Sequence, residues 1–172
     1  MRLQDLTFVL NAIQQMNIDA AGPFLGKLDM TRVAIAGHSM GGATAILALE
    51  QESRYKAAIV LNAILPHSLP VSTETPVLLL AAGRDQWSAV GRQVWGQLRG
   101  PRFAVNRRGA EHVTSTDEVW LAKDLISTGT MGTEKTIAAI RDYIAAFLDI
   151  NLRGQSVHPL LIGPSPDYPT LR

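Results

Sequence analysis

The chain has 172 residues, and its sixteen basic side chains nearly balance fifteen acidic ones, which leaves a formal net charge of +1. No block of like charge occurs along the chain, so the charge pattern does not indicate a nucleic-acid or anionic-membrane partner. Cysteine is absent, which excludes disulfides, thiolate metal sites and cysteine nucleophiles. Hydrophobic residues at 47% and charged residues at 18% are typical of a folded protein, and this length predicts a single domain over residues 1–172.

The apolar runs are far shorter than the roughly 20 residues that a membrane-spanning helix needs. The N-terminus carries Asp5 and lacks a basic region followed by a continuous apolar stretch, so it does not have the pattern of a secretory signal. We therefore expect no membrane span and a cytoplasmic protein for the chain as it stands. A signal lost upstream would make it a secreted protein.

The first predicted element is an amphipathic helix, because Leu3, Leu6, Leu10 and Ile13 recur at helical spacing. Short apolar runs typical of strands buried on both faces follow, with helical segments between them. The strands are predicted at residues 32–36, 57–61, 77–82 and 102–105, and the helices at 41–50 and 87–98. Strands that alternate with helices imply right-handed crossovers and a parallel sheet. The sequence therefore predicts a three-layer α/β fold, in which helices flank a mainly parallel sheet.

The C-terminal third is predicted to be helical, followed by an irregular tail. Ser115 and Glu118 have the spacing of a capping box, which predicts a helix that extends to Leu125. A longer helix is predicted over residues 134–153, because apolar residues recur along one stripe and a glycine follows it. The proline-rich residues 155–172 are predicted to be irregular.

Residues 37–42 read Gly-His-Ser-Met-Gly-Gly, directly after the first strand and before a helix. This is the G-x-S-x-G pattern in its strand-turn-helix context, where the glycines let a tight turn hold the serine in a strained conformation. We predict that Ser39 is a nucleophile and that the backbone N–H of Met40 binds the oxyanion formed in acyl transfer. The alternative is a glycine-rich turn in which Ser39 only caps the helix. His38 is interpreted as a packing or substrate-lining residue.

A serine hydroxyl becomes nucleophilic when a histidine takes its proton and a carboxylate orients that histidine. The chain order serine, acid, histidine is expected after a strand-turn-helix nucleophile. Asp85 follows the third strand and His112 the fourth, at the same end of the sheet as Ser39. The sequence therefore predicts a Ser39, Asp85 and His112 triad. The alternative for Asp85 is that it caps the next helix, and His67 is assigned a structural or surface role.

Residues 5–10, residues 37–44, the region of His112 with the final helix, and the ending at residues 160–169 resemble the α/β-hydrolases. Within them, the chain is similar to the branch of bacterial platelet-activating-factor acetylhydrolase-like esterases and cutinases. The resemblance implies an α/β-hydrolase-type fold and hydrolysis of carboxylic esters without a metal or cofactor. Specificity in this superfamily depends on loops, so the resemblance supports the reaction better than the substrate.

Two departures from these relatives affect the prediction. Acetylhydrolases of this type carry their acid at the position of Asn62, whereas cutinases carry it at the position of Asp85. Asn62 cannot supply a negative charge, so we expect it to orient a group near the triad. The relatives also begin well upstream, with strands that include the loop for a second oxyanion-hole N–H. We therefore expect an N-terminally truncated sheet in which the strand ending at Gly37 is an exposed edge. Two chains are expected to associate across it as a homodimer, or another chain to supply the missing part.

The sequence thus predicts a serine carboxylic-ester hydrolase that forms an acyl-enzyme, with short-chain acyl esters as small-molecule substrates. Two alternatives stay open. The first is a non-catalytic hydrolase scaffold that serves binding or assembly. The second is an acyltransferase that uses the same triad.

Overall fold

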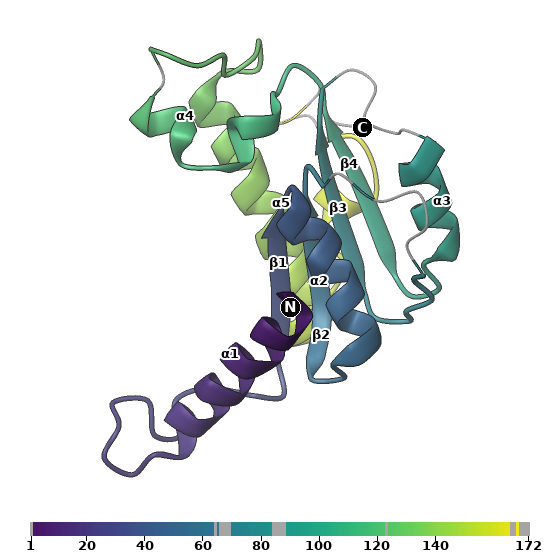
Figure 1. Ribbon diagram of the computed structural model, residues 1–172. Coiled ribbons are helices and arrows are strands. Elements are labelled where there is room, and N and C mark those ends of the chain that lie inside the picture. The colour runs from purple at the N-terminus through teal and green to yellow at the C-terminus, as the bar shows by residue number, and fades with distance from the viewer. Residues whose placement is uncertain are drawn as a thin grey trace.

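A parallel sheet forms the centre of the molecule. The computed structural model describes residues 2–63, 65, 70–83, 89–122, 124–165 and 168. In this part of the chain, four parallel strands stand in the order β1-β2-β3-β4 (Figure 1). They are β1 (Val33–His38), β2 (Tyr55–Leu61), β3 (Val77–Ala82) and β4 (Arg102–Arg107). The carboxyl ends of all four strands therefore lie along one edge of the sheet, as the sequence predicts.

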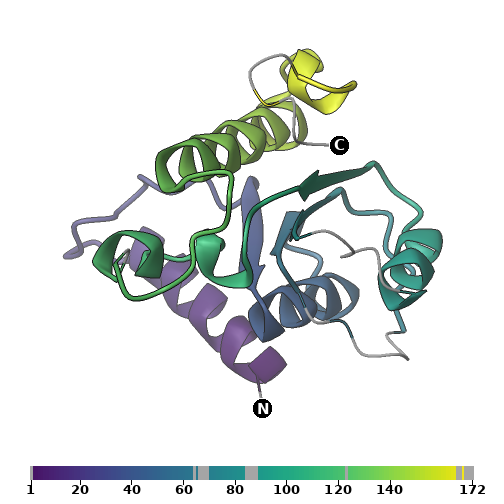
Figure 2. The same ribbon diagram turned by 90° about the horizontal axis from the view of Figure 1, so that it is seen from above.

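Helices cover both faces of this sheet. The described helices are α1 (Arg2–Ile18), α2 (Met40–Gln51), α3 (Ala89–Gln97), α4 (Glu118–Leu121) and α5 (Thr133–Arg153), with 3₁₀ turns η1 (His112–Ser115) and η2 (Pro159–Leu161). Seen from above, α1, α2 and α3 lie on one side of the sheet and α5 lies on the other (Figure 2). The three-layer α/β architecture is therefore confirmed.

The two central strands are buried on both faces because their side chains alternate between two cores. Ile59 and Leu78 belong to the core beneath α5, whereas Val60 and Leu79 belong to the core beneath α1, α2 and α3. All four side chains are less than a tenth exposed. The uninterrupted apolar runs of β2 and β3 follow from this two-sided burial.

β1 is an edge strand and pairs only with β2 among the described strands. Its burial is incomplete: Ile35 is buried, whereas Ala36 is exposed. The prediction that this strand is buried on both faces is therefore wrong, because β1 has a neighbour on one side only. The expectation of an edge at this strand is met.

The helix predicted from Ser115 and Glu118 is much shorter than expected. α4 ends at Leu121, so Leu125 lies beyond it. The residue before α4 is Asp117, and no side chain caps the helix. Ser115 does not form a capping box because its hydroxyl accepts hydrogen bonds from two buried side chains near the carboxyl ends of β2 and β4.

The long helix agrees with its prediction, and the tail is more ordered than expected. α5 ends at Arg153, and Gly154 follows in the left-handed conformation with φ 66°, the usual glycine stop signal. The tail then forms η2 and buries Tyr168, whose hydroxyl donates a hydrogen bond to Asp142 on α5. The prediction of an irregular tail therefore needs correcting, because part of it docks on α5.

In the part of the chain described above, no helix is long and apolar enough to cross a membrane. That residues 1–172 form one domain stays a prediction.

Candidate active site

The turn between β1 and α2 holds Ser39 in a strained backbone conformation. Its φ of 56° and ψ of −121° lie in a region that residues with a side chain rarely adopt. The Ser39 backbone N–H donates to the Leu61 carbonyl oxygen at 2.9 Å, which fixes the turn against the end of β2. The Ser39 side chain makes no capping hydrogen bond to α2. The alternative in which Ser39 only caps the helix is therefore wrong.

Two glycines of the motif are required by packing. A β-carbon on Gly37 would lie 2.1 Å from the carbonyl oxygen of Gly41, and one on Gly42 would lie 2.9 Å from the β-carbon of Ala63. A β-carbon on Gly41, in contrast, would meet nothing within 4 Å. The tight approach of α2 to β1 therefore depends on Gly37 and Gly42, whereas Gly41 has open space beside it.

Met40 is the first residue of α2. The first N–H groups of a helix have no partner inside it, and the helix dipole favours negative charge at this end. The oxyanion role of the Met40 N–H stays a prediction.

His112 begins the turn η1 and lies against the residue that precedes Ser39. The rings of His38 and His112 are 4.6 Å apart between centroids and tilted by 42°. The His112 carbonyl oxygen accepts a hydrogen bond from His38 Nε2 at 3.0 Å and a second from Asn62 Nδ2 at 2.9 Å. The predicted base therefore lies beside the end of β1, where the turn that holds Ser39 begins. Among the described residues, no hydrogen bond joins the His112 ring to the Ser39 hydroxyl. Such bonds often form only with substrate present.

The surroundings of His112 favour its neutral form. Burial lowers the pKa of the His112 imidazole below its ordinary value of 6.5, and the positive charge of His38 lowers it further. A neutral imidazole is the form that can accept a proton from a serine hydroxyl.

A buried polar cluster behind His112 was not predicted as a unit. Arg107 is fully buried, and its Nη2 donates to Asn62 Oδ1 at 3.0 Å and to Ser115 Oγ at 2.7 Å. Asn62 Nδ2 also donates to Ser115 Oγ, at 2.9 Å. Burial lowers the pKa of the Arg107 guanidinium to about 10. Sequence reasoning considered Asn62 for its place at a strand end, but no local signal marked Arg107 as buried.

Asp85, the predicted acid, lies outside the described residues, as does His67. β3 ends at Ala82, which is paired in register with Arg107, and Gly83 follows with φ 96°. The described chain places His112 against His38, the residue before Ser39, and the Ser39, Asp85 and His112 triad stays a prediction. Within the described residues, no group of three or more His, Asp or Glu side chains could hold a metal ion.

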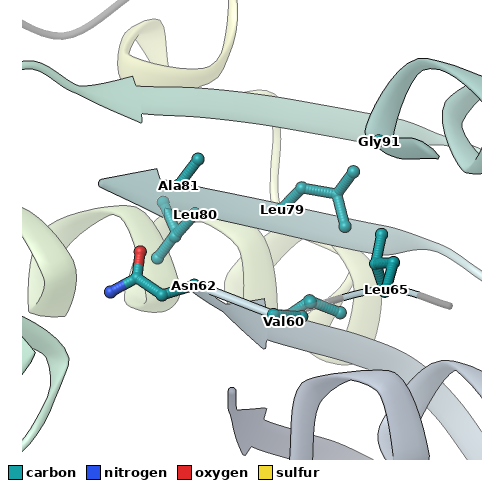
Figure 3. Close-up of a pocket in the computed structure, with 8 residues that line it drawn as sticks. Val60, Asn62, Leu65, Leu79, Leu80, Ala81 and Gly91 are labelled. Carbon is teal, nitrogen blue, oxygen red and sulfur yellow. The ribbon is translucent and has the colours of Figure 1, made fainter. Parts of the chain in front are cut away.

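A small apolar pocket lies beside this cluster, between β2, β3 and the start of α3 (Figure 3). Its volume is about 50 Å³, and it is lined by Val60, Asn62, Ala63, Leu65, Leu79, Leu80, Ala81 and Gly91. Figure 3 shows the amide of Asn62 pointing away from Val60 and Leu65. Since Val60 and Ala63 also lie where a β-carbon on Gly42 would clash, the pocket adjoins the first turn of α2.

The strained serine turn on a parallel sheet with helices on both faces is typical of the α/β-hydrolase fold. The ferulic acid esterase from Streptomyces cinnamoneus has a similar structure, with a TM-score of 0.81 and 30% sequence identity over 99% of this chain. Residues 7–152 match the family described as platelet-activating factor acetylhydrolase, isoform II. The chain belongs to that family.

A curated relative supports the same assignment. The platelet-activating factor acetylhydrolase of Gallus gallus is 38% identical over 70 residues, which cover 37% of this chain and 16% of that protein. The chain corresponds to 53% of the Streptomyces esterase, so it spans about half the length of that enzyme. The family match confirms the resemblance to acetylhydrolases and indicates a hydrolase. The likeness to cutinases stays a prediction.

Proposed function

We propose that this chain hydrolyses carboxylic esters through an acyl-enzyme on Ser39, with His112 as base and Asp85 as acid. The observation that carries the proposal is the backbone of Ser39, held at φ 56° where β1 meets α2, with His112 packed against the neighbouring residue. Backbone strain of this kind is concentrated at functional sites because it must be maintained by the surrounding structure. Membership of an acetylhydrolase family supports ester substrates.

The proposed reaction has two half-reactions. The Ser39 hydroxyl oxygen attacks the acyl carbon while His112 takes the hydroxyl proton, and the Met40 N–H stabilises the resulting oxyanion. The ester C–O bond then breaks, His112 returns the proton to the departing alcohol, and the acyl group stays on Ser39. In the second half, His112 takes a proton from water as the water oxygen attacks the acyl carbon. The bond between the acyl carbon and the Ser39 oxygen then breaks, the acid is released, and His112 returns the proton to the Ser39 oxygen. Asp85 holds the imidazole throughout.

Short-chain acyl esters are the proposed substrates. The pocket beside α2 is apolar apart from Asn62, and its 50 Å³ suits a small acyl group. Substrates with long acyl chains would need space elsewhere on the surface.

The edge of the sheet is the proposed place of self-association. β1 pairs on one side only among the described strands, and an uncovered edge invites pairing with another strand. We propose that two copies associate across it, or that another chain covers it. A strictly monomeric particle in sedimentation of the chain alone would contradict the dimer.

The reaction can be tested with a fluorophosphonate probe and p-nitrophenyl acetate. We expect labelling at Ser39 and measurable turnover, with both abolished in Ser39→Ala. Asp85→Asn should lower turnover about 10⁴-fold, the loss seen when a triad loses its orienting carboxylate. No labelling in the wild type, and the same turnover in Ser39→Ala, would favour the non-catalytic scaffold. Formation of a new ester when an alcohol is added would favour the acyltransferase.

A further inference from the structure

The carbonyl oxygen of His112 is held from two neighbouring strands. His38, the last residue of β1, donates to it at 3.0 Å, and Asn62, which follows β2, donates at 2.9 Å. A carbonyl oxygen has two lone pairs, so these bonds use its full accepting capacity. The main chain of the predicted base is thereby fixed to the carboxyl edge of the sheet by two side chains distant in sequence.

Arg107 determines which way the Asn62 amide faces. The guanidinium only donates hydrogen bonds, so the atom of Asn62 that lies 3.0 Å from Nη2 must be the accepting oxygen. The amide nitrogen then faces His112 and Ser115, to which it donates. Reversing the amide would set its N–H group against the guanidinium and its oxygen against the His112 carbonyl.

Stability alone does not account for a guanidinium at this place. Arg107 is fully buried, and its Nε and Nη1 have no hydrogen-bond partner in the part of the chain that the structure describes. Among the described residues no carboxylate forms an ion pair with it. Replacing a buried ion pair by apolar side chains of similar volume is often neutral or stabilising, so burial of a charge is weak evidence that it stabilises the fold. The bonds that Arg107 does make go to Asn62 and Ser115, and both of these side chains contact the His112 turn.

We propose that Asn62, oriented by Arg107, and His38 are positioning residues that fix the turn His112–Ser115 through the His112 carbonyl. A charged donor strengthens the bonds of the group that it contacts, so Arg107 makes the Asn62 amide a better donor. The asparagine that stands where acetylhydrolases carry their acid thus holds the main chain of the base. The catalytic consequence of this arrangement rests on the proposed function, whereas the fixing of the turn does not.

Asn62→Asp is the sharpest test. Aspartate has the shape of asparagine, tolerates the φ of 47° seen here and can still accept from Arg107, but it cannot donate to the His112 carbonyl. Loss of one hydrogen bond should speed amide exchange at Thr114 and Thr116, whose N–H groups close the turn, about two- to tenfold. If the base is misplaced, kcat for p-nitrophenyl acetate should fall about ten- to a hundredfold with KM within about threefold.

Asn151→Asp is the matched control. Asn151 Nδ2 donates to the Phe147 carbonyl oxygen at 2.8 Å on α5, so the substitution removes the same kind of bond elsewhere. It should change neither kcat nor the exchange of Thr114 and Thr116.

A second variant keeps the test decisive if Asn62→Asp fails to fold. His38→Phe retains a ring against His112 but removes the other donor to its carbonyl, so it should also speed exchange in the turn. Wild-type exchange in both variants would overturn the proposal. The proposal would also be overturned if Asn62→Asp turned over faster than the wild type and kept this rate when Asp85→Asn was added. A carboxylate at position 62 would then serve as the acid. Absence of turnover in the wild type would refute the proposed function while exchange still decides the positioning.

Discussion

The turn that carries Ser39 and the turn that carries His112 meet at one edge of the sheet, but different parts of the sequence hold them in shape. The Ser39 turn depends on its own neighbours, chiefly Gly37, whose missing β-carbon lets α2 start against β1. The His112 turn depends on the side chain of Asn62, 50 residues away in sequence, and on that of Arg107 at the end of the preceding strand β4. We infer that changes at the first turn affect folding, whereas changes around the second affect activity with little effect on stability.

The largest effect should come from breaking the serine turn itself. A β-carbon in Gly37→Ala would lie 2.1 Å from a backbone oxygen, so we expect a loss of about 4 kcal/mol or more in unfolding free energy. Gly41→Ala has open space and replaces a glycine within α2, so it should gain about 0.5–1 kcal/mol. Urea unfolding of the two variants measures this difference. Equal effects at the two glycines would contradict the packing argument.

The next effect concerns the base turn and should be one of activity. Arg107→Met removes a buried charge with two nitrogens that have no partner among the described residues, but it also leaves the buried Asn62 Oδ1 without its donor. These effects oppose each other, so the unfolding free energy should change by less than about 3 kcal/mol. Turnover should nevertheless fall about tenfold or more, since Asn62 loses the group that orients it.

Arg102→Met is the control for Arg107→Met, at the other end of the same strand. Arg102 donates to the carbonyl oxygen of Trp95 and lies over its ring, 4.9 Å from the ring centroid. Its loss should lower stability and leave kcat unchanged. If Arg107→Met is strongly destabilised and fully active, Arg107 is a structural residue only.

This contrast also explains what could be predicted from the sequence. The strands and the serine turn follow from local patterns, namely apolar runs and the spacing of glycines around Ser39. The placement of His112 follows because parallel strands bring their carboxyl ends together. The spacing predicts Ser115 as a helix cap, which is wrong because spacing alone cannot reveal a buried guanidinium that binds the Ser115 hydroxyl. The apolar pattern also predicts Leu125 in this helix, but Leu125 is exposed and lies beyond α4, which ends at Leu121.

A smaller effect should come from relieving the strain at Ser39. Ser39→Gly and Ser39→Ala both remove the hydroxyl, but only glycine adopts a φ of 56° without steric cost. Ser39→Gly should therefore be more stable than Ser39→Ala by about 1 kcal/mol, the lower end of what such strain costs. Thermal unfolding of both variants isolates this backbone contribution. Equal stability would mean that the turn stores no strain.

The smallest effect should be a shift in pH dependence. The pKa of His112 lies below 6.5 because of burial first and the charge of His38 second. His38→Phe removes the second cause, and a looser turn also lessens the burial of His112, so the acid limb of kcat/KM should move up toward 6.5. An NMR titration of the His112 ring measures the same change without substrate, and an unmoved pKa would exclude His38 as a cause.

The same lowered pKa makes the stability of the wild type depend on pH. Between the folded pKa of His112 and 6.5, the unfolded state binds more protons, so stability falls as pH decreases through that window. Because His38→Phe raises the pKa of His112 in the folded state, it narrows this pH range and should reduce the loss of unfolding free energy across it. Urea unfolding at a series of pH values from 7 downward, with wild type and variant in parallel, checks the sign. A larger loss of unfolding free energy in the variant would show that His38 stabilises protonated His112. That result would contradict the conclusion that His38 lowers the pKa of His112.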